Sequence, residues 1–349
     1  MKGEMDVKSP MSLYIQSILF FPALIAALAL CITGCDEDLE NGDNTPSETD
    51  EYVSPQHSLA WSPDGSMLAY ILESLLVVKE AETDELRSLT GTGTYDSPTW
   101  SPDSIKIAYS SSSYAERSSI WSKDADGSSV AKRLTSNSTT DNRPRWSPDG
   151  IWISFHSRRS VSAGLDIWIR KADGSGDDLV IASSPESDQN AEWSPDNTML
   201  AFESKRSENG DFDIWVARID GTTSPLQITS DPAADKYPRW SPDGTSIAFR
   251  SERGGSQGIW VKNADGSGDS VLVNTELAKA SAHDWSPDGT QIAFVSDGTI
   301  YVKNSDGTGV AMKIAEGSGP RWSPDGTKMG IVAISEEQLE VQIIDVISQ

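Results

Sequence analysis

Apolar and polar positions follow one unit that recurs along most of the chain. Each unit has a short stretch ending in tryptophan, the polar sequence Ser-Pro-Asp, and then an apolar run such as Thr245–Arg250. Short apolar runs bounded by turn sequences are typical of β-strands. The Trp-Ser-Pro-Asp block begins at Trp61, Trp100, Trp146, Trp193, Trp240, Trp285 and Trp322. Successive blocks lie 39, 46, 47, 47, 45 and 37 residues apart, and a period of about 40–45 residues is that of a four-stranded propeller blade.

The unit around Trp240 shows the expected strands most clearly. We predict strands at Lys236–Trp240, Thr245–Arg250, Gly258–Lys262 and Ser270–Asn274. In the turn that follows Trp240, proline presets φ and Gly244 accepts a left-handed backbone, which favours a tight hairpin. A second aromatic repeat falls in the third strand of the units, at Trp121, Trp168, Trp215, Trp260 and Tyr301. Aromatic residues at blade period are expected to pack between neighbouring sheets.

These patterns predict an all-β fold, a seven-bladed β-propeller of four-stranded antiparallel blades over residues 51–349. Rings of six or eight blades are the alternatives. The seventh unit has only three predicted strands, with the second at Thr327–Ser335 and the third at Glu340–Ile347. We expect Glu51–Pro55 to pair as its outer strand and to close the ring, because closure protects strand edges.

The first 50 residues have a different composition. Lys2 and Lys8 precede an uncharged apolar run at 18–32, which is the layout of a secretory signal and is short for a membrane-spanning helix. The segment Ile32–Cys35 resembles the lipobox of bacterial lipoproteins. That resemblance implies a lipoprotein signal peptide over residues 1–34, lipidation of Cys35, and export to the periplasmic side or the cell surface of a bacterial membrane. An uncleaved N-terminal anchor is the alternative.

Residues 35–50 are acidic and almost free of apolar side chains, so we expect a disordered tether. The whole chain carries a net charge of −25; eight acids without a base at 36–51 and a neutral 1–34 leave −17 for residues 52–349. Such a surface repels phosphate backbones and anionic lipid, so we expect no nucleic-acid partner and membrane contact through the lipid anchor only. The only cysteines, Cys31 and Cys35, precede the propeller, which therefore forms no internal disulfide. We expect the protein to be a monomer.

The stretch Trp240–Phe249 resembles the consensus of the TolB-like propellers, a family related to WD-repeat propellers. The resemblance extends over nearly all of residues 52–349 and implies a protein of the bacterial envelope. TolB itself carries an additional α/β domain before its propeller, in a place where this sequence shows only the tether. A part in the Tol–Pal envelope system is therefore not implied.

The loops of the predicted blades fall on two faces, because strands in a blade alternate in direction. One face carries near-identical turns, and the loops of the other face differ between units. Binding residues concentrate in variable loops on a rigid scaffold, so we expect the functional surface there. The candidates, which would accept an acidic segment or ligand, are Asn142, Arg143, Arg158, Arg159, Asn190, Lys205, Arg206, Lys236, Tyr237, Arg253 and His283. The alternative is that they are solvated loop ends with structural ion pairs.

The residue before the repeat tryptophan alternates in sign along the chain. From the third unit to the seventh it is Arg145, Glu192, Arg239, Asp284 and Arg321. Innermost strands of neighbouring blades are adjacent, so these residues are expected to form inter-blade ion pairs. A structural role is favoured over a ligand role, because buried charges need partners.

No catalytic residues are predicted, and the chain has no His-Glu-x-x-His motif. Turns such as Asp124–Gly127 lack the distal glutamate of a calcium loop, and no metal or other cofactor is expected. The favoured function is a non-catalytic module that binds a protein or glycan of the cell envelope. The alternative is a carbohydrate-active lyase or hydrolase at the channel mouth. Some polysaccharide lyases resemble this repeat and use channel histidines around a metal, for which His57, His283 and Asp284 are the candidates.

Overall fold

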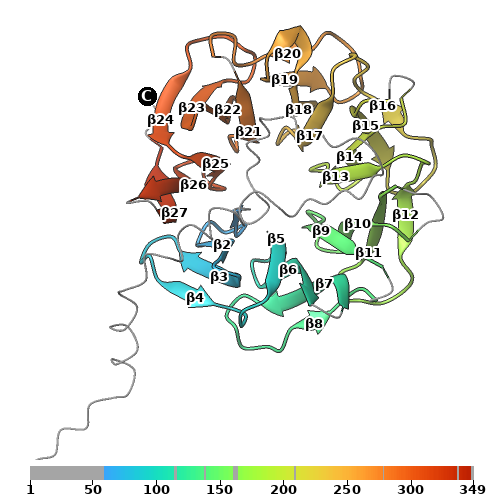
Figure 1. Ribbon diagram of the computed structural model, residues 1–349, viewed down its shortest axis with the longest axis vertical. Coiled ribbons are helices and arrows are strands. Elements are labelled where there is room, and N and C mark those ends of the chain that lie inside the picture. The colour runs from blue at the N-terminus through green and yellow to red at the C-terminus, as the bar shows by residue number, and fades with distance from the viewer. Residues whose placement is uncertain are drawn as a thin grey trace, which may run out of the picture. The chain divides into compact units, whose positions relative to one another are not determined.

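The computed structural model describes residues 59–113, 116–136, 139–159, 164–207, 210–277, 279–335 and 338–346. In them the chain forms seven antiparallel sheets, arranged as the blades of a ring (Figure 1). Blades are numbered 1 to 7 in chain order; six have four strands, and blade 7 has three among the described residues. The predicted seven-bladed propeller is confirmed. The signal peptide, Cys35, the tether, the closing strand at Glu51–Pro55 and His57 all lie outside the described residues.

Each blade runs outward from the central axis (Figure 1). The innermost strands are β1 (Ala60–Trp61), β5 (Thr94–Trp100), β9 (Asp141–Trp146), β13 (Asp188–Trp193), β17 (Asp235–Trp240), β21 (Ala280–Trp285) and β25 (Ser318–Trp322). The second strands are β2 (Met67–Leu72), β6 (Lys106–Ser113), β10 (Trp152–Ser157), β14 (Met199–Ser204), β18 (Ser246–Ser251), β22 (Gln291–Ser296) and β26 (Lys328–Ser335).

The third strands are β3 (Leu75–Glu80), β7 (Glu116–Asp124), β11 (Asp166–Lys171), β15 (Asp213–Arg218), β19 (Gly258–Asn263), β23 (Thr299–Asn304) and β27 (Gln338–Asp345). The outer strands are β4 (Leu86–Ser88), β8 (Lys132–Arg133), β12 (Leu179–Ala182), β16 (Leu226–Gln227), β20 (Val271–Leu272) and β24 (Met312–Glu316). A short 3-10 turn, η3 (Arg253–Gly255), follows β18. Within the described residues no helix has the length and apolar character needed to cross a membrane.

Apolar side chains fill the interfaces between neighbouring blades, so the core is itself a ring. Ile259 of blade 5 packs with Trp285 and Phe294 of blade 6, and the same arrangement joins Val332 of blade 7 to Leu68 of blade 1. Fully burying one such side chain contributes about 1.5–3 kcal/mol. Packing of blade 7 on blade 1 closes the ring within the described residues.

The repeat tryptophans also link the blades by hydrogen bonds. Each linking indole Nε1 donates to the backbone oxygen of the residue before the preceding repeat tryptophan. These bonds are Trp61 to Arg321 (2.9 Å), Trp100 to Ala60 (2.8 Å), and Trp193 to Arg145, Trp240 to Glu192 and Trp285 to Arg239 (3.1 Å each). The bond from Trp61 joins the first blade to the last. Among the described residues, the buried indole nitrogens of Trp146 and Trp322 have no hydrogen-bond partner.

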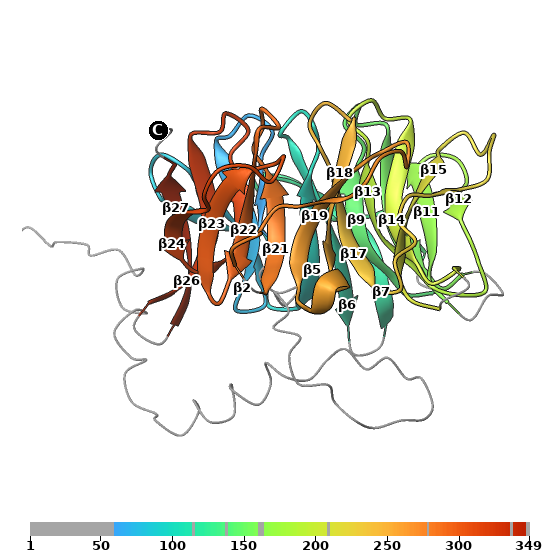
Figure 2. The same ribbon diagram turned by 90° about the horizontal axis from the view of Figure 1, so that it is seen from above.

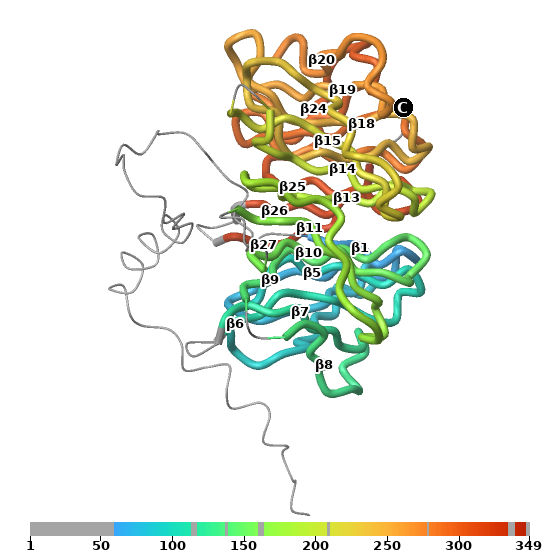
Figure 3. The backbone as a smooth tube through the Cα atoms, turned by 90° about the vertical axis from the view of Figure 1, so that its right-hand side faces the viewer, coloured from blue at the N-terminus to red at the C-terminus, as the bar shows by residue number. Residues whose placement is uncertain are grey.

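The Ser-Pro-Asp turns share one hydrogen-bond pattern. In blade 5, Ser241 Oγ donates to Asp243 Oδ1 at 2.6 Å, and Thr245 N donates to the same oxygen at 3.0 Å. The fourth turn residue is left-handed even where it is not glycine, with φ of 63° at Asn197 and 60° at Ser104. These turns define the turn face of the ring. The loop face lies at the opposite ends of the strands and carries the loops between second and third strands; Figures 2 and 3 show the blades from the side.

Candidate functional site

A backbone irregularity recurs in the innermost strands, three residues before the repeat tryptophan. The residue there has positive φ in blades 2 to 6: 51° at Ser97, 53° at Arg143, 56° at Asn190, 58° at Tyr237 and 26° at Ala282. In each case the strand pairing shifts register at this point. Such a conformation costs on the order of 1–3 kcal/mol in a residue other than glycine, and it clusters at functional sites.

Three of these bulge residues line one recess, where β9, β13 and β17 face the axis. The recess has a volume of about 60 Å³. A cavity needs about 10–15 Å³ for one water molecule, so this space holds a few waters or one small chemical group. Its lining residues are Arg143, Arg145, His156, Asn190, Ala191, Glu192, Tyr237, Pro238 and Arg239. Three guanidinium groups and one carboxylate give this lining a formal charge of +2 (3 − 1).

Charged side chains at the base of the recess connect blades 3, 4 and 5. Glu192 Oε2 lies 3.8 Å from Arg145 Nε and 3.1 Å from Arg239 Nη1. The pKa of Arg145 is lowered to about 10, mainly by burial; Glu192 opposes the shift, and Arg239 and Arg143 add to it. The pKa of Arg239 is instead raised: burial opposes the shift, but both Glu192 and Asp284 favour the cation.

The same belt continues into blades 6 and 7. Arg321 Nη1 lies 4.0 Å from Asp284 Oδ1, and Trp322 N donates to Asp284 Oδ2 at 2.9 Å. Burial lowers the pKa of Arg321 to about 10, and the charge of Arg239 acts in the same direction. The alternating residues therefore form two groups of ion pairs, Arg145–Glu192–Arg239 and Asp284–Arg321. The charge of Asp284 also acts on Arg239, so three cations face two anions.

The second strands of blades 3 to 5 carry a row of buried polar residues that the sequence reasoning missed, and one of them, His156, also lines the recess. His156, Glu203 and Arg250 occupy equivalent places in β10, β14 and β18 and are buried. Glu203 accepts hydrogen bonds from Gln189 Nε2 at 3.0 Å, from Tyr237 N at 2.9 Å and from Asn190 Nδ2. Burial raises the pKa of Glu203, against the lowering effect of the hydrogen bonds from Tyr237 and Asn190.

The buried row on the second strands holds the residues that line the recess in place through direct contacts. Arg143 Nη1 donates to Asn190 Oδ1, while the amide group of Asn190 donates to Glu203. The guanidinium carbon of Arg250 lies 4.9 Å from the ring centroid of Tyr237, within cation–π range. His156 Nε2 accepts from Ala191 N at 3.4 Å, and burial lowers the pKa of this imidazole well below its usual value, so it is neutral.

Three of the predicted binding arginines are turned into the fold. Arg159, Arg206 and Arg253 each pair with a buried aspartate at the start of the innermost strand: Asp141, Asp188 and Asp235. In blade 4, Arg206 Nη2 lies 2.6 Å from Asp188 Oδ2, and its guanidinium lies 5.2 Å from the ring centroids of Phe202 and Trp215. We call each Asp–Arg pair with its two aromatic rings a lock.

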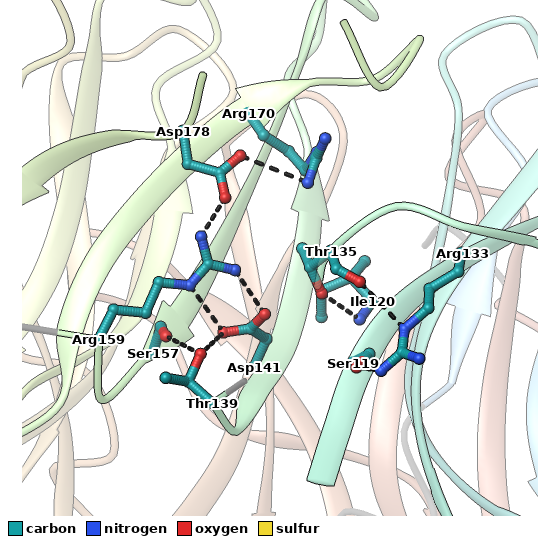
Figure 4. Close-up of polar contacts among 10 residues, drawn as sticks. All are labelled: Ser119, Ile120, Arg133, Thr135, Thr139, Asp141, Ser157, Arg159, Arg170 and Asp178. Carbon is teal, nitrogen blue, oxygen red and sulfur yellow. Dashed lines mark hydrogen bonds and ion pairs between the residues drawn. The ribbon is translucent and has the colours of Figure 1, made fainter. Parts of the chain in front are cut away.

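Figure 4 shows the Asp–Arg pair of the blade 3 lock, in which Arg159 points at Asp141 and at Asp178. Arg159 Nε also donates to Asp141 Oδ1 at 3.2 Å. In the locks of blades 4 and 5, burial raises the pKa values of Asp188 and Asp235, even though arginine hydrogen bonds lower them. These contacts give Arg159, Arg206 and Arg253 partners within their own blades.

The remaining candidates are spread around the loop face. Lys205 and Lys236 both lie near Phe212, with Nζ 5.0 and 5.4 Å from its ring centroid. Asn142 is half-buried beside Arg143, and Arg158 is exposed. His283 is 3 % exposed in β21; burial, with Arg239 and other nearby arginines, lowers its pKa to about 3. The structure therefore brings Arg143, Asn190 and Tyr237 together and leaves His283 outside the lining of the recess.

Candidate metal ligands do not converge in the described part of the chain. No group of three or more His, Cys, Asp or Glu side chains there could hold a metal ion. His57, one of the three residues considered for a metal-dependent active site, lies outside the described residues.

The repeat architecture agrees with a known family. Residues 28–202 and 166–305 match the family model described as the TolB beta propeller domain. The chain belongs to the TolB β-propeller domain family. TolB from Acinetobacter baumannii is similar in structure, with a TM-score of 0.53 and 19 % sequence identity over 71 % of this chain. The chain spans 60 % of the length of that TolB.

Other members of this architecture carry different names. Oligogalacturonate lyase from Vibrio parahaemolyticus has a TM-score of 0.65 and 15 % identity, covering 83 % of this chain and 89 % of its own. Hydrazine synthase from Kuenenia stuttgartiensis has a TM-score of 0.65 and 12 % identity, covering 87 % and 99 %. At these identities the likeness shows a shared fold, which hosts many functions. No curated protein shows significant sequence similarity to the chain.

Proposed function

We propose that the protein is a non-catalytic binding module of the bacterial cell envelope, exported and held at a membrane by a lipid on Cys35. It holds its partner, a protein or a glycan, on the loop face of the propeller, centred on the recess of blades 3 to 5. The observation that carries this proposal is the recess itself, lined by three bulge residues with positive φ and backed by buried His156 and Glu203.

Several features of that recess cost stability. Left-handed backbone in a residue other than glycine is strained, and a buried carboxylate such as Glu203 loses its hydration. Apolar residues fill the place of Glu203 in blades 6 and 7, where Val295 and Val332 are buried. The scaffold thus accommodates an apolar residue at this position, and the polar version in blades 3 to 5 is best explained by a role in binding.

Affinity capture from an envelope extract tests the proposal. The bait is the full chain with a C-terminal tag, and Arg143→Asn is compared with Arg218→Gln. Asn tolerates the left-handed backbone of position 143, as Asn190 does in the next blade. Arg218 pairs with Asp220 at the end of β15, away from the recess, at 3.1 Å. We expect a partner that the Arg143 variant loses and the Arg218 variant keeps; equal capture by both variants would contradict the proposal.

A carbohydrate-active enzyme is the second candidate function. It is favoured by one observation, the similarity in fold to an oligogalacturonate lyase solved in complex with manganese, with a TM-score of 0.67 and 14 % identity. Incubation of the full chain with acidic oligosaccharides, with and without Mn²⁺, tests it by mass spectrometry. Shortened products that depend on the protein would favour the enzyme, and intact oligosaccharides would favour the binding module.

A further inference from the structure

The recess of blades 3 to 5 is positively charged within an acidic molecule. Its lining has a formal charge of +2, whereas the whole chain has a net charge of −25. The net charge of the chain therefore repels an anionic ligand, whereas the lining of the recess attracts it. Charge patterning of this kind directs a ligand to its site and excludes competing modes of binding.

The cations around the recess are held close to one another. Burial lowers the pKa of Arg145; Arg239 and Arg143 act in the same direction, and Glu192 and Asp96 oppose them. Glu192 is shared between Arg145 and Arg239, so one carboxylate faces two guanidinium groups. An additional anion placed between Arg143 and Arg239 would relieve this repulsion.

The residue types favour a carboxylate as that anion. A guanidinium presents its N–H donors in a planar fork that matches the two oxygens of a carboxylate. Arg143 is oriented by its hydrogen bond to Asn190, and Asn190 by its hydrogen bond to the buried Glu203. Tyr237, whose ring is covered by Arg250, and Pro238 add apolar surface to the same lining.

The volume of the recess restricts what can carry the carboxylate. About 60 Å³ accommodates a carboxylate on a thin aliphatic stem, but not a complete sugar ring. An aspartate or glutamate side chain has this shape, with a methylene stem that would lie against Tyr237 and Pro238. A uronic acid carries its carboxylate directly on a ring, which would remain outside.

We propose that the recess binds the side-chain carboxylate of an acidic peptide segment, with Arg143 and Arg239 as its anion-binding groups. The inference rests on the proposed function and names the partner class for the same site. Asn190 and Glu203 act as positioning residues, because they orient Arg143 and do not themselves supply the positive charge. The partner is thus a protein with an exposed acidic segment, and not a glycan.

Two labelled peptides test the proposal by fluorescence anisotropy with the full chain. They share a Gly/Ser backbone and differ only at their central residues, Asp in one and Asn in the other. We expect the Asp peptide to bind about tenfold or more tightly than the Asn peptide, as a charge-assisted hydrogen bond contributes, and to weaken with added salt. Arg143→Asn should remove the preference for Asp, Arg143→Lys should keep part of it, and Arg218→Gln should leave it unchanged.

Three results would overturn the proposal. They are equal affinity for the two peptides, an unchanged preference in Arg143→Asn, and displacement of the Asp peptide by tri-galacturonate at lower concentration than by the unlabelled peptide. Arg239→Gln, with circular dichroism to verify folding, gives a second readout at the other anion-binding group. Failure here is distinguishable from failure of the proposed function: loss of the captured partner in Arg143→Asn without any preference for Asp would retain the binding module and reject the carboxylate.

Discussion

Blades 3 to 5 and blades 6 and 7 share one scaffold but differ in the residues at the axis and the loop face. The innermost strands of blades 3, 4 and 5 begin with a buried aspartate that locks an arginine, as Asp188 does with Arg206. Blades 6 and 7 have Ala280 and Gly317 at the same position in the repeat. Ten residues after the repeat tryptophan, His156, Glu203 and Arg250 contrast with Val295 and Val332.

The difference separates what the fold requires from what it merely accommodates. Both groups of blades keep the Ser-Pro-Asp turn pattern. Both also contain hydrogen bonds from a repeat tryptophan to the preceding blade, as Trp240 and Trp285 show. Of these two groups of blades, only blades 3 to 5 have Asp–Arg locks and a buried His, Glu or Arg ten residues after the repeat tryptophan, among the described residues. Since an apolar version of the same blade forms in the same molecule, the polar additions are the part most directly attributable to function.

The largest expected effect comes from breaking a lock. Asp188→Ala gives blade 4 the residue that blade 6 carries and leaves Arg206 without its buried partner. We expect a loss of about 3 kcal/mol in the free energy of unfolding, measured by urea denaturation. Asp188→Ala combined with Arg206→Met removes both charges and should recover most of that loss. A double variant as unstable as the single one would show that the aspartate stabilises blade 4 by other means.

The buried histidine of blade 6 gives the next effect. The pKa of His283 is about 3 in the folded protein, against 6.5 for an exposed imidazole. Between these values the unfolded chain takes up a proton that the folded chain does not, so stability falls as pH decreases. His283 contributes about 1.4 kcal/mol per pH unit to this slope. His283→Pro, which gives blade 6 the residue found at Pro144 and Pro238, should remove that contribution between pH 6 and pH 4.

The pKa of His156 is lowered in the same direction, but His156 is present in both the wild type and the variant. Its contribution therefore cancels when the two pH profiles are compared. The melting temperature of the wild type should therefore fall more steeply than that of the His283 variant as the pH decreases from 6 to 4. Parallel pH profiles between pH 6 and pH 4 would mean that His283 is protonated in the folded protein as it is in the unfolded chain.

A smaller effect distinguishes two tryptophans of the same repeat. Trp240 Nε1 donates to Glu192 O at 3.1 Å, whereas the buried Nε1 of Trp146 has no partner in the described part of the chain. Trp240→Phe should cost about 1 kcal/mol more than Trp146→Phe in the free energy of unfolding, because only the first leaves a backbone acceptor unpaired. Equal losses would indicate that the rings act by packing alone.

The smallest effect is expected in the Ser-Pro-Asp turns, which blades 3 to 5 share with blades 6 and 7. Hydrogen bonds from Ser241 and Thr245 lower the pKa of Asp243, so its carboxylate stabilises the fold above the unfolded pKa of 3.8 and stops doing so as pH falls through the lower folded value. Asp243→Asn should lower the melting temperature slightly at pH 6 and not at all near pH 2. A difference that persists at pH 2 would mean that its cause is not the charge.

The fold could be predicted because its determinants are local and repeated. The predicted strand at Lys236–Trp240 corresponds to β17 (Asp235–Trp240), and the predicted Thr245–Arg250 corresponds to β18 (Ser246–Ser251). The left-handed positions at Asn197 and Ser104 follow from the same turn in the other blades. Each blade repeats one pattern of turns and apolar runs, so each copy supports the others.

The candidate site was only partly predictable. Arg143, Asn190 and Tyr237 were among the expected binding residues, but their convergence depends on bulges that arise from strand pairing, which alternation along one strand does not specify. Glu203 was missed because β14 otherwise reads as an apolar core strand. Comparing residues ten positions after each tryptophan would have revealed it, since that column changes from valine to charged or polar residues.

Hydrogen–deuterium exchange on the complex with the captured partner tests most directly whether blades 3 to 5 form the binding surface. The comparison is between residues 139–145, 186–192 and 233–239 in blades 3 to 5 and residues 279–284 and 315–321 in blades 6 and 7. We predict that the partner slows exchange in the first set and leaves the second set unchanged. Protection confined to blades 6 and 7, or to the Ser-Pro-Asp turns, would contradict a binding surface centred on Arg143, Asn190 and Tyr237.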